Sequence, residues 1–354
     1  MKSIRTITII TVLLVSLLSF TNLNSATEVQ TSKLSTLDIH DLLVKQKTLL
    51  QADGIIAVVM ESKTGKIVSM ESANRLIPNT KYNEENAIEY SHEQGGVMKP
   101  IIFSLLLDKG LVFPNELIDC HDGNYTLGAK TIIDENKFKI LTAEDVIVYS
   151  SNIGMVQIVQ RISGKEYEEG LDKFGFGRFS GIDIQGEKSG SIPTSTQLDF
   201  YLYKAIVSYG YGVNANLLQM VKAFNAFNNN GRMVTPKLHE SNKIQSSQVI
   251  SPSAAQRMKQ ILIKTVNEGT GAIAKTQGLE IGGKTGSAFI TKDEKYIDNY
   301  NTNFIGFAND DKNSYTIGIT VINPQSSYSS SSTAGGVFKA IVEAMVQKKY
   351  LEPR

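Results

Sequence analysis

Two pairs of short apolar runs, one near each end of the chain, constrain the fold most strongly. Residues 54–70 contain two runs rich in β-branched side chains around a turn-forming segment, which predicts a β-hairpin. Residues 303–323 repeat this arrangement around a polar turn and predict a second hairpin. Between about residues 90 and 275 the pattern is mostly helical. Strands at both ends with helices between them predict an α/β (α+β) domain, in which a central antiparallel sheet is flanked by helices and carries a helical subdomain.

Helical periodicity predicts the other elements. Residues 34–50 form an expected amphipathic helix, with Ser35 and Thr36 available as caps. The serine-rich segment 326–333 is expected to be a loop. Further helical patterns cover residues 100–109, 142–163, 197–230, 253–268 and 337–346.

The first 26 residues have the order of an export segment. Lys2 and Arg5 precede the apolar run 7–20, and residues 21–30 are polar, as in a signal peptide or an uncleaved membrane anchor. The apolar run is short for a membrane span, but extending it to residues 6–23 brings it near the ~20 residues that a span needs. We expect an uncleaved anchor in preference to a cleaved signal peptide.

The expected anchor also sets the topology. Because positive residues stay on the cytoplasmic side, the remainder of the chain should face the periplasm from the inner membrane, or be secreted there if the segment is cleaved. Residues 27–50 then form a linker and a first helix, and residues 51–354 form one domain.

Charge and cysteine content exclude several classes of protein. The chain has 36 Lys and Arg against 35 Asp and Glu, a net charge of +1, so it lacks the basic field that nucleic-acid binding needs. Cys120 is the single cysteine, which rules out an internal disulfide and a thiolate metal cluster. The four histidines lack metal-ligand spacing. We expect no metal and no cofactor.

Residues 278–285 (GLEIGGKT) satisfy the phosphate-loop pattern, but their context differs from that of a phosphate loop. Such a loop follows a buried strand and opens a helix, whereas here the residues upstream are loop or helix-like and residues 287–291 continue as strand. The alternative is a K-T-G element, Lys284-Thr285-Gly286, on a strand at the edge of a cleft. A lysine ammonium and a threonine hydroxyl can hold a substrate carboxylate.

A second element has the pattern S-x-N. Ser150, Ser151 and Asn152 lie between a helix capped by Thr142 and a helical run over 153–162. Read alone, these residues could simply cap the second helix. Together with K-T-G they indicate a serine acyl-transferase site.

Over residues 50–350 the chain resembles the transpeptidase domain of class B penicillin-binding proteins. The matching stretches include VVMESKTGKIVSM, LTAEDVIVYSSNIGM, SYGYGVNANLLQM, EGTGAIAK and IGGKTGSAF, in the family's order. The resemblance implies the penicillin-binding transpeptidase fold and a cleft between sheet and helical subdomain. It also implies a substrate-binding strand at Gly283, Lys284, Thr285, Gly286 and Ser287.

The first family motif departs from the pattern. Where the family has a segment like E-P-G-S-T-F-K-P, this chain reads EQGGVMKP over residues 93–100. Lys99 is retained, but Gly96 stands at the nucleophile position, and the chain contains no S-x-x-K or T-x-x-K. The resemblance therefore implies a degenerate catalytic set: Lys99, Ser150, Asn152, Lys284 and Thr285.

Glycine has no atom that can form an acyl-enzyme, so we expect a catalytically inactive homologue. It would act in peptidoglycan and cell-wall biogenesis by binding stem peptide or a β-lactam non-covalently, or a cell-wall synthesis or division protein. One alternative is an active D,D-transpeptidase or carboxypeptidase with a non-standard nucleophile, Ser91 or Ser150. A β-lactamase is less favoured because it needs the same missing serine.

Overall fold

The computed structural model describes residues 36–73, 86–239, 243–292, 295–327 and 329–354. The expected export segment, residues 1–26, lies outside these ranges. The described residues belong to a single compact unit. Among them, no helix combines the length and the apolar character needed to cross a bilayer.

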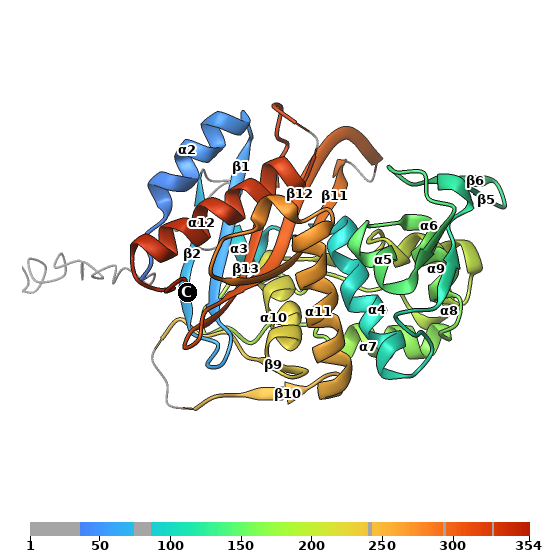
Figure 1. Ribbon diagram of the computed structural model, residues 1–354, viewed down its shortest axis with the longest axis horizontal. Coiled ribbons are helices and arrows are strands. Elements are labelled where there is room, and N and C mark those ends of the chain that lie inside the picture. The colour runs from blue at the N-terminus through green and yellow to red at the C-terminus, as the bar shows by residue number, and fades with distance from the viewer. Residues whose placement is uncertain (1–35, 74–85, 240–242, 293–294, 328) are drawn as a thin grey trace, which may run out of the picture. The chain divides into compact units, whose positions relative to one another are not determined.

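A five-stranded antiparallel sheet forms the centre of the domain (Figure 1), with the strand order β11-β12-β13-β1-β2. Both predicted hairpins are confirmed, and β13 pairs with β1 from Glu61 opposite Tyr315 to Gly54 opposite Ile322. β11 is an edge strand. The strands are β1 (Gly54–Glu61), β2 (Ile67–Ala73), β11 (Glu280–Lys292), β12 (Lys295–Asn309) and β13 (Ser314–Ile322).

One face of the sheet is covered by helices α2 (His40–Leu50) and α12 (Gly336–Gln347), as Figure 1 shows. Leu37, Leu43 and Phe338 are buried there in one core with alternate residues of β1 and β13. The first helix thus packs into the core of the domain that was expected to begin at residue 51. The predicted cap at Thr36 is wrong: the Thr36 hydroxyl donates to the Val68 carbonyl of β2 at 3.4 Å, and no side chain caps α2.

The opposite face is covered by α10 (Leu217–Asn228), which contacts β13. Asn216 begins this helix in a capping box with Gln219, whose side chain accepts from the Asn216 backbone N–H. Gly318 of β13 allows the close approach, since a Cβ there would lie 2.5 Å from Val221 of α10.

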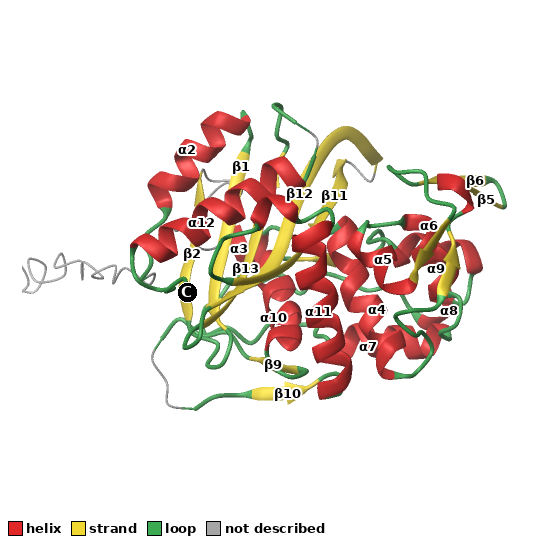
Figure 2. Cartoon of the chain, viewed as in Figure 1, coloured by secondary structure: helices red, strands yellow, loops and turns green. Residues whose placement is uncertain are grey.

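The helical subdomain lies beside the β11 edge (Figure 2). Two predicted helical segments are each broken. The segment 142–163 divides into α5 and α6 at residues 149–151, and the segment 197–230 divides into α8, α9 and α10. The helices of this part and its borders are α3 (Asn86–Glu89), α4 (Lys99–Asp108), α5 (Ala143–Val148), α6 (Asn152–Val159), α7 (Gly164–Lys173), α8 (Ser195–Leu198), α9 (Tyr201–Ser208) and α11 (Pro252–Glu268).

Short antiparallel pairs connect these helices: β3 (His92–Glu93) with β8 (Asn214–Ala215), β4 (Leu117–Asp119) with β7 (Ile140–Thr142), β5 (Asn124–Leu127) with β6 (Lys130–Ile133), and β9 (Arg232–Val234) with β10 (Ser246–Gln248). Short helical turns are η2 (Gly95–Met98), η3 (His121–Gly123), η4 (Ala272–Ala274) and η5 (Ser331–Gly335). The prediction of a loop throughout residues 326–333 is wrong, because a π-helical turn begins at Ser331 and leads into α12.

Candidate functional site

A cavity of about 770 Å³ lies where the β11 edge meets the helical subdomain. Its walls come from distant parts of the sequence: η2, the break between α5 and α6, β11 and the segment before α12. Hydroxyl groups dominate the surface, including Thr270, Thr285, Ser287 and residues 329–331. A cavity with these walls can bind a polar ligand.

Lys99 enters the floor of the cleft from the first residue of α4. Its side chain is 1% exposed. The Nζ atom donates to the Ser150 carbonyl at 2.5 Å and to the Ser150 hydroxyl at 3.1 Å. Pro100 at the second helical position needs no N–H partner, so the helix can begin here without an additional acceptor.

Ser150 stands between two lysines. It lies at the break between α5 and α6 with φ of +63°, a left-handed conformation that is uncommon for a residue with a side chain. Besides Lys99, its hydroxyl accepts a hydrogen bond from Lys284 Nζ at 2.8 Å. Two acceptor positions are thereby used, and the hydroxyl proton remains free to be donated.

Lys284 and Thr285 belong to the edge strand β11. Lys284 is fully buried, and its Nζ also donates to the Thr285 carbonyl at 3.0 Å. Thr285 donates to the Thr270 hydroxyl at 3.0 Å, which joins the strand to the segment after α11. Among the described residues, no carboxylate lies within ion-pair distance of Lys99 or Lys284.

Burial of these two ammonium groups changes their acidity. Burial lowers the pKa of Lys99 to about 8, against the opposing attraction of Asp134 and Glu135. Burial, and then the charge of Lys99, lowers the pKa of Lys284 well below its usual value. An anion in the cleft would oppose both effects, because it favours the charged amines.

Asp134 holds the S-x-N segment in place. Its buried carboxylate accepts from the Ser151 hydroxyl and from the backbone N–H groups of Asn152 and Ile153, at 2.5 and 3.1 Å. Ser151 also caps α6 by accepting from the Gly154 N–H at 2.8 Å. Asn152 donates from its side chain to the Ile133 carbonyl at 3.3 Å and lines the cleft. The cap that the sequence predicted at this junction is therefore formed, by Ser151.

Gly96 lies in η2 and lines the cleft. A Cβ atom at this residue would lie 3.4 Å from the Ser150 hydroxyl oxygen and 3.1 Å from the Thr285 carbonyl oxygen. A side chain at position 96 would therefore enter the cleft beside Lys99, Ser150 and Thr285.

The structure brings together most of the residues selected from the sequence. Gly96, Lys99, Ser150, Asn152, Thr285, Gly286 and Ser287 line the cleft, and Lys284 contacts Ser150 beneath it. Gly283 faces the other way, since a Cβ there would meet Phe304 at 2.5 Å. Residues 280–292 form one continuous strand, so the GLEIGGKT segment is not a phosphate loop.

Several cleft residues were not selected from the sequence. Four tyrosines line it, Tyr149, Tyr209, Tyr211 and Tyr300, together with Thr270. The stretches EGTGAIAK and SYGYGVNANLLQM contain three of these residues and were the available signal. Ser91 is not part of the cleft lining. The described residues contain no group of three or more His, Cys, Asp or Glu side chains placed to hold a metal ion.

Comparison with known protein families identifies the family of the domain that contains this cleft. Residues 55–343 match the family model of the penicillin binding protein transpeptidase domain. The chain belongs to this family. The transpeptidase match spans the sheet, the helical subdomain and all the cleft residues described above.

Two relatives in this transpeptidase family show how far the sequence of this chain has diverged from theirs. Penicillin-binding protein PbpB of Mycobacterium tuberculosis is 28% identical over 316 residues, covering 81% of this chain. The probable peptidoglycan D,D-transpeptidase PbpC of Pseudomonas aeruginosa is 28% identical over 261 residues, covering 71% of this chain. The chain spans 46% of the length of each relative.

A solved transpeptidase domain has the same fold. The transpeptidase domain of Burkholderia pseudomallei penicillin-binding protein 3 superposes with a TM-score of 0.82 at 26% identity, covering 91% of this chain and 96% of that one. The predicted fold class is thus confirmed.

Proposed function

We propose that this transpeptidase domain acts in cell-wall biogenesis by binding peptidoglycan stem peptide without forming an acyl-enzyme. The observation that carries the proposal is the position of Gly96. The Cβ direction of this residue points at Ser150, three residues before Lys99, where a nucleophilic oxygen would have to project. We assign Gly96 to the nucleophile position of the family, which leaves the site without an oxygen to acylate.

The rest of the cleft supports binding. Two buried ammonium groups lack a carboxylate partner among the described residues, and they share Ser150 as a neutral acceptor. The free hydroxyl proton of Ser150 and the hydroxyl of Ser287 are donors for a ligand. A carboxylate at this point would receive charge-assisted hydrogen bonds. The C-terminal carboxylate of a peptide fits this requirement.

We also propose a cellular location for the domain. The basic and apolar start of the sequence supports an inner-membrane anchor with the domain in the periplasm, where stem peptides and cell-wall synthesis proteins are available. A division or elongation protein is a further candidate partner.

A labelling experiment tests the absence of acylation. The full-length protein and its Gly96→Ser variant are incubated with a fluorescent penicillin and separated on a denaturing gel. The unmodified protein should remain unlabelled, because loss of the nucleophile in a comparable serine hydrolase costs about 10⁶ in turnover. Gly96→Ser should be labelled if the Thr285 carbonyl yields by a few tenths of an ångström, and a Gly96→Ala variant serves as the matched control without an oxygen.

One alternative has a specific observation in its favour. Ser150 already lies within 3.1 Å of Lys99 and 2.8 Å of Lys284, and both amines have lowered pKa values, so Ser150 could be an activated nucleophile. This alternative predicts that the unmodified protein is labelled and that Ser150→Ala is not. Labelling of this kind would refute our proposal.

A binding experiment tests whether the cleft binds the C-terminal carboxylate of a stem peptide. An acetylated peptide ending in D-Ala-D-Ala should bind the full-length protein, and its C-terminal amide should bind at least about tenfold more weakly, because a charge-assisted hydrogen bond is lost. Lys284→Met should remove this difference. Equal affinity for carboxylate and amide would show that the cleft does not read the carboxylate.

A further inference from the structure

The position beside Gly96 suits one small polar molecule. An atom in the Cβ direction of this residue lies 3.1 Å from the Thr285 carbonyl oxygen and 3.4 Å from the Ser150 hydroxyl oxygen. It therefore has an acceptor and a donor within hydrogen-bond range. The next atom, the Gly286 Cα at 3.6 Å, is at van der Waals distance. Since a water molecule in a protein needs about two to four polar partners, a water oxygen fits at this position.

Lys99 presents its amine to the same part of the cleft. Its Nζ atom donates to the carbonyl and to the hydroxyl of Ser150. A neutral amine has two hydrogens and one lone pair, so it can make both of these bonds and keep the lone pair for a third partner. Because Lys99 lines the cleft, the third direction opens to a ligand. The lone pair then lies beside the same Ser150 hydroxyl that a water next to Gly96 would contact.

The surroundings of Lys99 make its neutral form available. Burial lowers the pKa of Lys99 to about 8, although the charges of Asp134 and Glu135 act in the opposite direction. Lys284 faces it from β11, and burial and the charge of Lys99 lower the pKa of Lys284 as well. A general base is most effective when its pKa is close to the working pH. Lys99 meets this condition.

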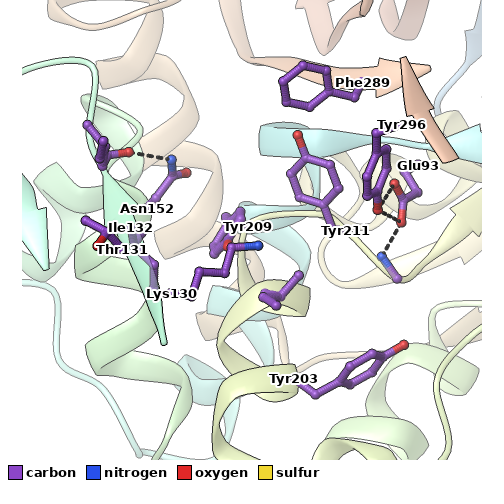
Figure 3. A pocket seen from close by; sticks show the side chains of 13 residues that line it. Glu93, Lys130, Thr131, Ile132, Asn152, Tyr203, Tyr209, Tyr211, Phe289 and Tyr296 are labelled. Atoms are coloured by element: carbon purple, nitrogen blue, oxygen red, sulfur yellow. Dashed lines mark hydrogen bonds between the residues drawn. The ribbon is translucent and has the colours of Figure 1, made fainter. Parts of the chain in front are cut away.

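The other groups of the cleft are less suited to accept a proton. Burial raises the pKa values of Tyr209 and Tyr211 to about 12, so both stay protonated. These tyrosines and Asn152 also line an adjoining pocket of about 530 Å³ (Figure 3). The Asn152 side chain is an amide and donates to the Ile133 carbonyl. No histidine is among the described residues that line the cleft, and the Glu135 side chain is exposed to solvent.

The ligand of the proposed function would bring a peptide bond to this water. Its C-terminal carboxylate lies beside Lys284 and Ser150, and the preceding carbonyl group lies one residue away, about 3.8 Å along the peptide. The Cβ direction of Gly96 ends at a similar distance, 3.4 Å, from the same Ser150 hydroxyl. The water and the penultimate carbonyl carbon therefore occupy neighbouring positions, as direct attack requires.

We propose that this protein slowly hydrolyses the terminal peptide bond of a stem peptide by direct attack of a water molecule held beside Gly96, with Lys99 as the general base. This inference rests on the proposed function, because the same peptide must occupy the cleft. It adds an activity that needs no acyl-enzyme.

The proton transfers return the site to its starting form. One water proton passes to the Lys99 amine while the water oxygen forms a bond with the carbonyl carbon of the penultimate residue. The C–N bond to the terminal residue then breaks, and the leaving nitrogen takes the hydroxyl proton of Ser150. Lys99, at 3.1 Å, gives its new proton to the Ser150 oxygen. The products are a peptide shortened by one residue, with a new carboxyl group, and the free terminal amino acid.

Release of D-alanine tests the proposal on the full-length protein. The protein is treated with penicillin and dialysed, which inactivates any co-purified serine transpeptidase, and is then incubated with an acetylated peptide ending in D-Ala-D-Ala. Loss of the nucleophile in a comparable serine hydrolase leaves an acceleration of about 10³–10⁴ over water, so slow release is expected. The value of kcat/KM should increase roughly tenfold between about pH 7 and about pH 9, as Lys99 loses its proton.

Two substitutions separate hydrolysis from binding. Gly96→Ala puts a methyl group at the water position and should lower D-alanine release at least about tenfold, while the peptide affinity measured by calorimetry changes less than about twofold. Lys99→Met removes the base and should lower release by about 10² or more. Gly336→Ala and Lys139→Met are the matched controls, because neither residue lines the cleft, and both should release D-alanine at the unchanged rate.

An added amine distinguishes water attack from an acyl-enzyme. Free glycine should not be incorporated into the peptide, and a product that carries it in place of the terminal D-alanine would overturn the inference. Release that is unaffected by Gly96→Ala and Lys99→Met would overturn it as well.

The binding measurement keeps the two proposals apart. If the peptide binds but no D-alanine is released, the inference is overturned while the proposed function stands. If release depends on Gly96 and Lys99 although calorimetry detects no bound peptide, the inference is supported and the proposed binding role has failed. If there is neither binding nor release, both are overturned.

Discussion

The buried amine of Lys99 should make the stability of the domain increase with pH above neutrality. Burial lowers its pKa from 10.5 to about 8 in the folded protein, so between these values the unfolded chain binds more protons than the folded one. Stability rises with pH wherever the unfolded state binds more protons. The cost of burying the charge is therefore fully present below pH 8 and is relieved as the amine deprotonates.

The size of the effect follows from the two pKa values. Between about pH 7.5 and about pH 9.5, Lys99 alone should add roughly 2 kcal/mol to the free energy of unfolding. Lys284, whose pKa is also lowered by burial and by Lys99, contributes in the same direction. Buried tyrosines with raised pKa values, such as Tyr209 at about 12, act in the opposite direction only at higher pH.

Urea unfolding of the full-length protein at a series of pH values measures this slope. Lys99→Met is the comparison variant, because methionine is unbranched and of similar length and carries no charge. Its free energy of unfolding should rise less steeply over the same pH range, because Lys99 no longer titrates, while the burial that lowers the pKa of Lys284 remains. Parallel curves for the two proteins would show that Lys99 is not desolvated as described.

Three further substitutions test the packing around the site by urea unfolding. Asp134→Ala removes the acceptor of three hydrogen bonds and should cost about 2 kcal/mol; a loss below about 0.5 kcal/mol would contradict its role in holding the S-x-N segment. Tyr167→Phe removes a buried hydroxyl that has no hydrogen-bond partner and should leave stability unchanged or raise it by about 1 kcal/mol, so a clear loss would reveal a missed partner. Gly318→Ala places a methyl group 2.5 Å from Val221 and should cost about 1–3 kcal/mol. Gly336→Ala is the control for it, because that Cβ would meet nothing within 4 Å, and similar effects of the two changes would refute the close-approach argument.

Local signals in the sequence were enough to predict the hairpins, the caps at Thr142 and Ser151 and the separate motifs. The apolar, β-branched runs of β1 and β13 and the cap at Thr142 depend on neighbours a few residues away. Ser150 and Lys284 were also assigned to one site, although 134 residues separate them. The resemblance to a family supplied that long-range contact, which no local pattern encodes.

The pocket lined by Glu93, Lys130, Tyr211 and Tyr296 could not be predicted in this way. Glu93 meets Tyr296 only because the first residues of β12, paired with the end of β11, lie beside β3. Lys130 reaches the same space from a two-stranded hairpin with no recognisable motif. Opposed charges of this kind depend on tertiary placement, whereas hydrophobic periodicity reports only which face of an element is buried.

The pairing of β13 with β1 has a consequence for the order of events during synthesis. Ser62, directly after β1, and Thr316 of β13 have hydroxyls 3.0 Å apart, yet these residues are 254 residues apart in the chain. At ribosomal rates of about 5–20 residues per second, the first hairpin waits some tens of seconds for its central partner. During that time the apolar edge of β1 is open to pairing with other chains. The first hairpin of a nascent chain with this architecture must therefore be kept apart from other chains until the last strand has been made.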